Sequence, residues 1–140
     1  ALEVLIATGR PMSSFHGEAA PVLKAGEWAG VTLTPPRETL YERINTRVEK
    51  MMKLGALEEA RRLWERKLDP ELPAMRAHGM PGFADHFAGR SSLADAVERC
   101  KRDTRRYAKR QVTWFRNQMP GWIWVAPGEG MAAAETLMQT

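Results

Sequence analysis

The stretch from Leu93 to Gln118 constrains the fold more than any other part of the chain, because it is long and contains neither proline nor glycine. Ser91 and Ser92 stand before it, and Pro120 follows it. A serine here can accept a hydrogen bond from a free N–H of the first turn, and proline cannot continue a helix. Together with an acidic Asp95 near the start, which suits the positive helix end, the pattern predicts one long helix with either serine as its N-cap.

The side chains of this predicted helix fall on two faces when they are set at about 100° per residue. The apolar face consists of Leu93, Ala96, Val97, Cys100, Tyr107, Ala108, Trp114 and Phe115. The opposite face consists of Arg102, Arg105, Arg106, Lys109, Thr113 and Arg116. Like charges one turn apart repel, so a face of nearly one sign indicates an anionic partner such as phosphate. The alternative is a solvated charged face over a core, which is the usual role of an amphipathic helix.

Gln111 is the unusual polar residue of the predicted apolar face, with Thr104 close to it. A buried amide costs stability unless it is paired. We therefore expect Gln111 either to tie down another segment or to point into a binding site. A basic stripe backed by Tyr107 and Trp114 is typical of an RNA-facing helix, although Trp114 lies toward the core side and is interpreted as structural first.

The segment from Thr104 to Arg116, TRRYAKRQVTWFR, closely resembles the C-terminal signature of the tRNA dimethylallyltransferase family, also called the tRNA isopentenyltransferase or IPP transferase family. These enzymes prenylate an adenine next to the anticodon. The resemblance implies that this segment contacts the anticodon stem-loop of tRNA. The residues assigned to that contact are Lys109, Arg110, Gln111, Val112, Thr113, Trp114, Phe115 and Arg116.

Composition limits the class of protein. With 140 residues the chain can bury one modest core, so one domain or part of one is expected. A net charge of +4 and a pI near 9.6 favour an acidic partner only mildly, so the clustering of charge carries more weight than its total. One cysteine excludes internal disulfides and fits the reducing cytoplasm. No apolar run approaches the roughly 18–20 residues of a membrane span.

The start of the chain favours a helix over residues 1–8 that Gly9 would cap, followed by a loop over residues 11–30. The segment ALEVLIATGRP resembles the family's helix after its tRNA-contacting insertion, although the family's arginine would lie just before Ala1. The first residue is not Met and the predicted helix opens in its middle, so we expect truncation. Val31–Thr34 then alternates β-branched and apolar residues and predicts a short strand.

A second amphipathic helix is predicted from Arg37 onward, with a break at Gly55 and a further helix over Ala56–Lys67. Its expected core stripe consists of Leu40, Ile44, Val48, Met51 and Met52. The two methionines are interpreted as core packing rather than as part of a cofactor site.

Arg43 and Arg47 lie one helical turn apart, so their guanidinium groups can converge on one anion. The surrounding sequence also resembles the family's pattern for the helix whose arginines approach the diphosphate of the prenyl donor. The resemblance assigns Arg43 and Arg47 to diphosphate binding, with Arg37 as a third candidate.

Residues 68–90 contain several prolines and glycines and are predicted to be mostly connector, with a short helix over Phe83–Phe87. The segment around Arg76 resembles a tRNA-contacting segment of the family. It assigns Arg76, Ala77, His78, Gly79 and Met80 to tRNA binding. His78 replaces an apolar residue and Met80 an aromatic one, and a methionine can pack but cannot stack on a base. Without a partner cluster His78 indicates a structural or RNA-adjacent role rather than a metal site.

The C-terminal region contains an aromatic run over Trp122–Val125 that predicts a second strand, and residues 129–140 predict a short helix or a tail. We therefore expect a predominantly α-helical fold with one or two short strands, which belong to one small or incomplete sheet. The resemblance implies the C-terminal part of an α/β P-loop-type nucleotide-binding fold. Residues 1–128 would belong to the prenyltransferase catalytic domain and residues 129–140 to its tail.

A phosphate-binding loop of the type G-x-x-x-x-G-K-[ST] is absent from this sequence. The family keeps that loop, its general-base aspartate and its Mg²⁺ site in an N-terminal portion. We therefore assign no catalytic residue and no metal ligand to this chain, and expect Mg²⁺ to be a cofactor held elsewhere. The N-terminal half of the same enzyme is the expected protein partner, and the chain alone is expected to be inactive.

The implied reaction moves a dimethylallyl group from dimethylallyl diphosphate to N6 of an adenosine in tRNA. One alternative is the related adenylate isopentenyltransferase, which acts on a free nucleotide, but a long basic stripe is more than a mononucleotide needs. A second alternative is a non-catalytic helical RNA-binding module. The two predicted strands argue against that alternative, because such short strands need further sheet partners.

Overall fold

The computed structural model describes residues 2–15, 22–24 and 26–139, and the chain divides into two compact units, Ala1–Gly30 and Val31–Thr140. In the first unit, α1 (Leu2–Thr8) is followed by the 3₁₀ helix η1 (Met12–Phe15). Gly9 takes a positive φ of 68° and its N–H donates to the carbonyl of Leu5, so it ends α1 as predicted. The remainder of the predicted loop lies partly outside the described residues.

In the second unit, two successive helices are joined at a glycine. Helix α2 (Arg37–Lys53) leads through Gly55 into α3 (Ala56–Glu65). Gly55 has a φ of +97°, a conformation that favours glycine, and this confirms the predicted break. Two of the expected core residues of α2, Ile44 and Val48, are buried.

The connector after α3 contains the 3₁₀ helix η2 (Pro73–Arg76) and α4 (Met80–Phe87). Helix α4 begins earlier than the predicted Phe83. Pro81 stands in its first turn, where a missing N–H breaks no helical hydrogen bond, so this proline starts the helix rather than preventing it.

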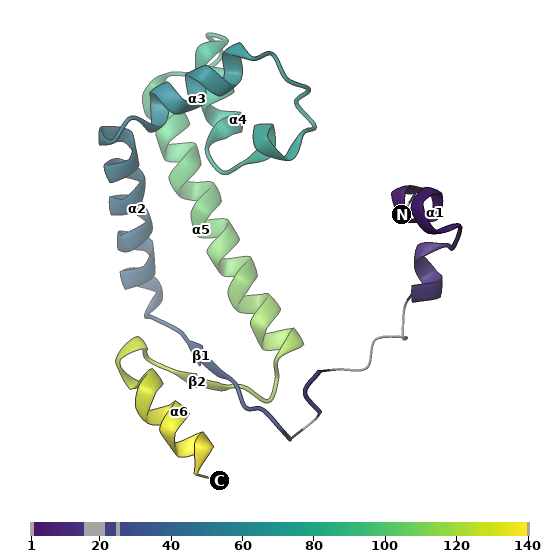
Figure 1. The fold of residues 1–140 in the computed structure, drawn as a ribbon. Helices are drawn as coiled ribbons and strands as arrows, with labels where there is room; N and C mark the ends of the chain where they lie inside the picture. Colours follow the sequence, from purple (N-terminus) through teal and green to yellow (C-terminus); the bar gives the residue numbers. More distant parts are fainter. Residues whose placement is uncertain (1, 16–21, 25, 140) are drawn as a thin grey trace. The chain divides into compact units, whose positions relative to one another are not determined.

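Helix α5 (Leu93–Gln118) has the predicted bounds. Ser92 is the N-cap: its Oγ accepts from the backbone N–H of Asp95 at 3.1 Å and donates to the Asp95 carboxylate at 2.6 Å. Figure 1 shows α5 running beside α2, with α3 and α4 gathered at its N-terminal end and the strands at its C-terminal end.

Strands β1 (Val31–Leu33) and β2 (Ile123–Val125) pair in parallel, with Thr32 opposite Trp124. The short 3₁₀ helix η3 (Pro127–Glu129) then leads into α6 (Gly130–Met138), which packs on this pair. The prediction of a mainly helical fold with two short strands in one small sheet is confirmed.

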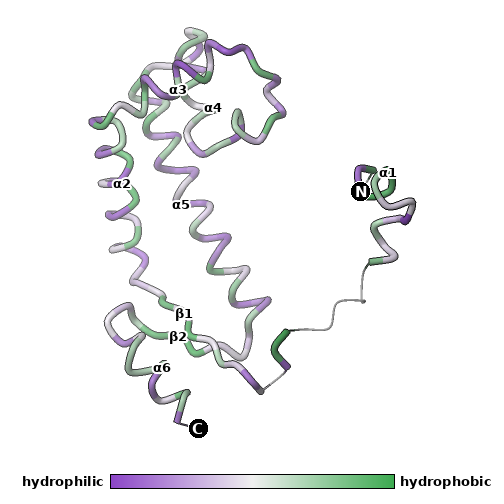
Figure 2. The backbone as a smooth tube through the Cα atoms, in the orientation of Figure 1, coloured by the Kyte–Doolittle hydropathy of each residue, from purple (hydrophilic) through white to green (hydrophobic). Residues whose placement is uncertain are grey.

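The core of the second unit lies where α3, α4 and α5 meet. It is formed by Ala60, Met80, Phe83 and Ala96. A Cβ on Gly82 would lie 3.2 Å from the carbonyl oxygen of Ala96, so the glycine permits close approach of α4 to α5. We call α3, η2, α4 and the N-terminal half of α5 the helical head, and β1, β2, α6 and the C-terminal half of α5 the sheet end. Figure 2 shows the strands as hydrophobic and α5 with long hydrophilic stretches.

Several expected core positions are exposed. Met51 near the end of α2 is 42% exposed, and on α5 the side chains of Tyr107 and Trp114 are 44% and 51% exposed. The helical head covers only the N-terminal half of α5, so the apolar face of the helix continues beyond the elements that pack against it. Gln111 lies in this uncovered half and is exposed, which corrects the expectation of a buried amide.

The charged face of α5 also differs from the prediction. Asp103 lies beside it and forms ion pairs with Arg106 at 3.7 Å and Arg102 at 3.9 Å, so part of its positive charge is compensated. Arg105 turns away from this face: its Nη1 donates to Oδ1 of Asn45 on α2 at 2.6 Å. The predicted basic stripe is therefore interrupted between Arg102 and Lys109.

Candidate RNA-facing and anion-binding site

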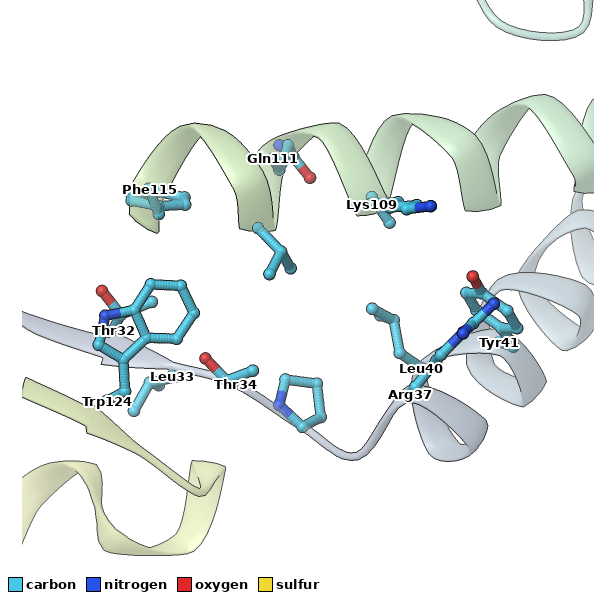
Figure 3. Close-up of a pocket in the computed structure, with 13 residues that line it drawn as sticks. Thr32, Leu33, Thr34, Arg37, Leu40, Tyr41, Lys109, Gln111, Phe115 and Trp124 are labelled. Atoms are coloured by element: carbon cyan, nitrogen blue, oxygen red, sulfur yellow. The ribbon is translucent and has the colours of Figure 1, made fainter. Parts of the chain in front are cut away.

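A cavity of about 410 Å³ lies at the sheet end, between β1, the start of α2 and the C-terminal half of α5. Figure 3 shows its two walls. Thr32, Thr34 and Trp124 come from the sheet side, whereas Lys109, Gln111 and Phe115 come from α5. The parallel register places Thr32 beside Trp124, and the alternation along β1 puts Thr34 on the same face as Thr32.

Two buried hydroxyls line this cavity without a partner. Among the described residues, neither Thr32 Oγ1 nor Thr34 Oγ1 makes a hydrogen bond. Most buried polar groups are paired, and leaving one unpaired costs free energy. The two hydroxyls can therefore bind a polar group that enters the cavity. Neither threonine was assigned to a site from sequence, although the Thr-x-Thr alternation in a predicted strand was the available signal.

Cations stand at one side of the same cavity. Arg37 from the first turn of α2 and Lys109 from α5 both line it, and the Arg37 guanidinium lies 5.0 Å from the ring centroid of Tyr41. The lining residues include no aspartate, glutamate, histidine or cysteine. The cavity therefore has groups that can bind an anion or a polar ring, but no side chain that could act as a carboxylate or imidazole base.

A second hollow of about 390 Å³ lies on α5 beside the first. It is lined by Tyr107, Arg110, Gln111, Trp114 and Phe115, and Gln111 and Phe115 line both hollows. The Arg110 guanidinium lies 5.9 Å from the Tyr107 ring, and Trp114 meets Phe115 edge-on at 5.2 Å. Exposed aromatic rings with neighbouring arginines form a surface on which nucleobases can stack.

The remaining assigned residues of α5 lie around these hollows. Val112 lines the 410 Å³ cavity, and the Thr113 hydroxyl donates to the carbonyl of Lys109 at 3.1 Å. Arg116 is exposed, and its guanidinium lies 5.7 Å from the Trp124 ring. The structure thus brings most of the residues assigned on α5 to one region of the sheet end.

Arg43 and Arg47 lie on a different face of α2 from Arg37. Both line an open groove on α2 together with Lys50 and one carboxylate, Glu42, and both are exposed. Among the described residues, no ion pair within 4 Å occupies either of them. The groove can therefore hold an anion, whereas Arg37 belongs with the first cavity.

The segment over Arg76–Met80 lies in the helical head. Arg76 is exposed and forms an ion pair with Glu71 at 3.3 Å, and Ala77 is also exposed. His78 contacts the Tyr107 ring edge-on at 4.9 Å, which links this segment to α5. Gly79 has a φ of +93° and is buried against Phe83 and Cys100.

Met80 is only 4% exposed and belongs to the core of the helical head. Its side chain is therefore not available for a direct contact with RNA, which corrects its assignment as a contact residue. The sequence pattern placed it in a connector, but Gly79 and Pro81 start α4 there and turn the methionine inward.

The titrating groups with shifted pKa values lie in contacts between helices. Hydrogen bonds from Arg90 and Arg99 lower the pKa of Asp85, and burial raises the pKa of the Cys100 thiol. Hydrogen bonds to Glu98 and Glu49 raise the pKa of Lys101. None of these three groups lines the two hollows of the sheet end, so their shifts reflect packing between elements.

Metal binding and membrane insertion find no support in the described part of the chain. Residues 2–15, 22–24 and 26–139 contain no cluster of three or more histidine, cysteine, aspartate or glutamate side chains that could hold a metal ion. Over the same residues, no helix has both the length and the apolar character needed to cross a membrane.

The family model described as IPP transferase matches residues 1–118 of the chain. A tRNA dimethylallyltransferase of Rhodopseudomonas palustris is 52% identical over 132 residues, which are 92% of this chain and 42% of that protein. One of Hyphomonas neptunium is 54% identical over 123 residues, or 87% of this chain and 39% of that protein. The chain thus spans about two fifths of the length of these relatives.

Two solved structures are similar to the chain. The tRNA isopentenylpyrophosphate transferase of Bacillus halodurans matches with a TM-score of 0.69 and 33% identity, over 79% of this chain and 39% of that one. The tRNA delta(2)-isopentenylpyrophosphate transferase of Staphylococcus epidermidis matches with a TM-score of 0.67 and 30% identity, over 99% of this chain and 46% of that one.

Proposed function

The chain belongs to the IPP transferase family, and from this membership we propose that it forms part of a tRNA-modifying prenyltransferase. The complete enzyme moves a dimethylallyl group from dimethylallyl diphosphate to N6 of an adenosine beside the anticodon. This chain supplies residues that grip the tRNA anticodon stem-loop and residues that neutralise the departing diphosphate.

The observation that carries the RNA-binding part of the proposal is the surface around Gln111. Two hollows share this residue, one lined by unpartnered threonine hydroxyls and Lys109, the other by exposed aromatic rings and Arg110. Cations bind phosphates, and aromatic rings stack on bases. Two adjoining hollows also exceed what a single free nucleotide fills, which favours tRNA over an adenylate substrate.

The diphosphate-binding part of the proposal rests on α2. In the reaction, the bond between the allyl carbon and the diphosphate oxygen breaks, and negative charge accumulates on the leaving group. Arg43 and Arg47 lie one turn apart on an exposed groove and can neutralise that charge together. Arg37, the third arginine assigned to diphosphate, lines the first cavity instead, where it can bind an anion together with Lys109.

The remaining parts of the machinery belong outside this chain in our proposal. The family's phosphate-binding loop, general base and Mg²⁺ ligands would come from the rest of an enzyme of full family length. Mg²⁺, when bound, supplies positive charge to the diphosphate. The proposed site of action is the cytoplasm.

Filter binding of an anticodon stem-loop at several salt concentrations tests the RNA contact. In the complete enzyme that carries this chain, Lys109→Ala and Arg116→Ala should each weaken binding and lower the slope of log K against log salt by roughly one unit, because each phosphate contact releases about one counterion. Arg62→Ala is the matched control, since Arg62 is an exposed arginine of α3 away from both hollows. An unchanged affinity and slope in both α5 variants would refute the RNA-facing role of α5.

Steady-state kinetics with the prenyl donor test the anion site. Arg47→Ala should lower kcat/KM for dimethylallyl diphosphate by about 100-fold or more, because removing a charge partner of the transition state costs roughly 3 kcal/mol. The dissociation constant for tRNA should change far less. Lys53→Ala, in the last turn of α2 and outside the groove, is the control. An unchanged kcat/KM for the donor would remove the diphosphate assignment.

A further inference from the structure

Helices α2 and α5 run side by side in opposite directions (Figure 1), and each carries polar side chains at intervals of one helical turn on the face toward the other. On α2 these are Tyr41, Asn45 and Glu49, and on α5 they are Lys101 and Arg105. Residues at this spacing lie above one another on a helix. The two helices therefore meet along a row of matched polar groups.

The distances define the pairs. Lys101 Nζ lies 3.0 Å from Oε1 of Glu49, and only 12% of the Lys101 side chain is exposed. Arg105 Nη1 donates to Asn45 Oδ1 at 2.6 Å. The Arg105 guanidinium also lies 5.9 Å from the ring centroid of Tyr41. We call these contacts, Glu49–Lys101, Asn45–Arg105 and Tyr41–Arg105, the α2–α5 ladder.

The ladder ends at the candidate site. Tyr41 lines the cavity at the sheet end, and the Arg37 guanidinium lies over the same ring at 5.0 Å. Arg105 is half-buried between the two helices, in the middle of the ladder. It therefore does not belong to the exposed surface that we propose binds RNA. Arg105 lies in the segment from Thr104 to Arg116, in which other cations are proposed to face RNA, so its role in that segment must be a different one.

Apolar contact alone does not fix how two helices slide along each other. Ile44 and Val48, the buried residues of α2, offer nondirectional packing. A guanidinium bonded to an amide oxygen is directional, so it accepts one register and rejects others. The two proposed functions lie on different helices, with the diphosphate groove around Arg47 on α2 and the RNA surface around Gln111 on α5.

We propose that Arg105 is a positioning residue that sets the register of α2 against α5 through Asn45 and Tyr41. It thereby fixes the distance between the diphosphate-binding arginines and the RNA-binding surface. This inference rests on the proposed function. It requires that group transfer depend on Arg105 even though neither substrate touches it.

Kinetics of the complete enzyme provide the first test. Arg105→Met keeps the length of the side chain but removes the hydrogen bond, and should lower kcat by about tenfold or more, because misplacing reacting groups by about 1 Å is costly. The KM for the donor and the dissociation constant for tRNA should stay within about twofold, since the binding groups themselves remain. Asn45→Leu should have a similar effect, and the double variant should be no slower than the slower single one.

Arg62→Met is the matched control and should keep its kcat within about twofold, because Arg62 is exposed on α3 and, among the described residues, forms no ion pair with either helix of the ladder. Three results would overturn the proposal. These are a kcat for Arg105→Met equal to that of the control, a tRNA salt slope lowered by about one unit, or a fall in kcat fully explained by loss of folded, titratable active sites.

A distance measurement separates this inference from the proposed function. Spin labels on Lys50→Cys of α2 and Arg102→Cys of α5 report the register directly, because both positions are exposed and the native Cys100 is buried. The distance distribution should broaden or shift in Arg105→Met and stay unchanged in Arg62→Met. If the enzyme transfers no prenyl group to tRNA, the proposed function fails, whereas an unchanged distance distribution in Arg105→Met overturns the ladder.

Discussion

Helix α5 contributes to both the helical head and the sheet end, but its side chains are buried in the head and exposed at the sheet end. In the head, Ala96 of α5 is 1% exposed and packs with Phe83 and Met80. At the sheet end, the same helix exposes Trp114, while Thr32 and Thr34 keep hydroxyls without partners among the described residues. The side chains at the N-terminal end of α5 pack against other residues of the chain. Those at the C-terminal end remain accessible to a ligand.

This difference teaches how the chain divides stability from function. Contacts that close a core remove side chains from the surface, so they cannot also bind substrate. The assigned residues of α5 lie beyond the reach of the head, where apolar and polar groups remain accessible. Met80 shows the converse, because its burial in the head leaves its side chain inaccessible to any ligand.

The largest expected contrast comes from truncating one phenylalanine in each region. Phe83→Ala should lower the free energy of unfolding by about 3–5 kcal/mol, because it leaves a cavity in a closed core. Phe115→Ala should cost less than half as much, since Phe115 borders two open hollows. Urea denaturation of the chain followed by circular dichroism measures both. Equal losses would mean that the sheet end is as tightly packed as the head.

Two glycine substitutions test how tightly the helical head is packed relative to the C-terminal region. Gly79→Ala should cost about 1–3 kcal/mol, because its φ is +93° and the new Cβ would lie 3.0 Å from Phe83 and 3.1 Å from Cys100. Gly128→Ala, where the new Cβ meets nothing within 4 Å, should stay within about 0.5 kcal/mol. Thermal unfolding of the two variants checks this. A tolerated Gly79→Ala would contradict the close packing of the head.

The acid stability of the head should depend on Asp85, which accepts from Arg90 and Arg99 at 2.6 Å each. Its pKa is lowered from 3.8, so its contribution is present above that pH and is lost as the pH falls through the lowered folded-state value. Asp85→Asn should cost about 1 kcal/mol at pH 7, and the difference from wild type should shrink below about pH 4. A difference that stays constant with pH would show that the carboxylate charge contributes nothing.

The smallest effect is expected at the unpartnered hydroxyls. Thr34→Val should leave the free energy of unfolding within about 0.5 kcal/mol or raise it, because a buried hydroxyl without a partner is replaced by a methyl group. The control is Thr104→Val, which removes a hydrogen bond to the Cys100 carbonyl at 2.8 Å and should cost about 0.5–1.5 kcal/mol. A larger loss in Thr34→Val than in Thr104→Val would show that the Thr34 hydroxyl has a partner in the folded chain.

Local signals in the sequence predicted much of this fold. The bounds of α5 follow from Ser92 and from the lack of helix breakers, and Gly55 separates α2 from α3 as expected. The two strands were recognisable from β-branched and aromatic residues. Each of these features depends on a few neighbouring residues, so the sequence contains the information needed.

The burial of side chains along a helix could not be predicted, because it depends on how far the neighbouring elements extend along that helix. A helical wheel assigns side chains around the axis, but it does not say how far along the axis a neighbouring element extends. Gln111 was therefore expected inside, although the core of the head does not extend to it. The bond from Arg105 to Asn45 joins residues far apart in the chain and leaves no local signal.

The candidate site shows the same limit. The spacing of Arg43 and Arg47 predicts that they share a groove, and they do. The cavity lined by Thr32 and Thr34 needs α5 opposite the strand, and no local pattern describes that placement. Whether these residues bind diphosphate and tRNA stays a prediction.

The parallel pairing of β1 with β2 has a consequence for the order in which the chain folds. All of α2, α3, α4 and α5 lie between the two strands in sequence, so the strands can meet only after a long loop has closed. Closing that loop costs chain entropy, whereas the turn between α2 and α3 involves near neighbours. The antiparallel packing of α2 against α5 brings the two strands together, and the sheet then forms last. Amide hydrogens of Thr34 and β2 should accordingly exchange sooner than those around Ala96, and the region that contains the candidate site is the one that opens first.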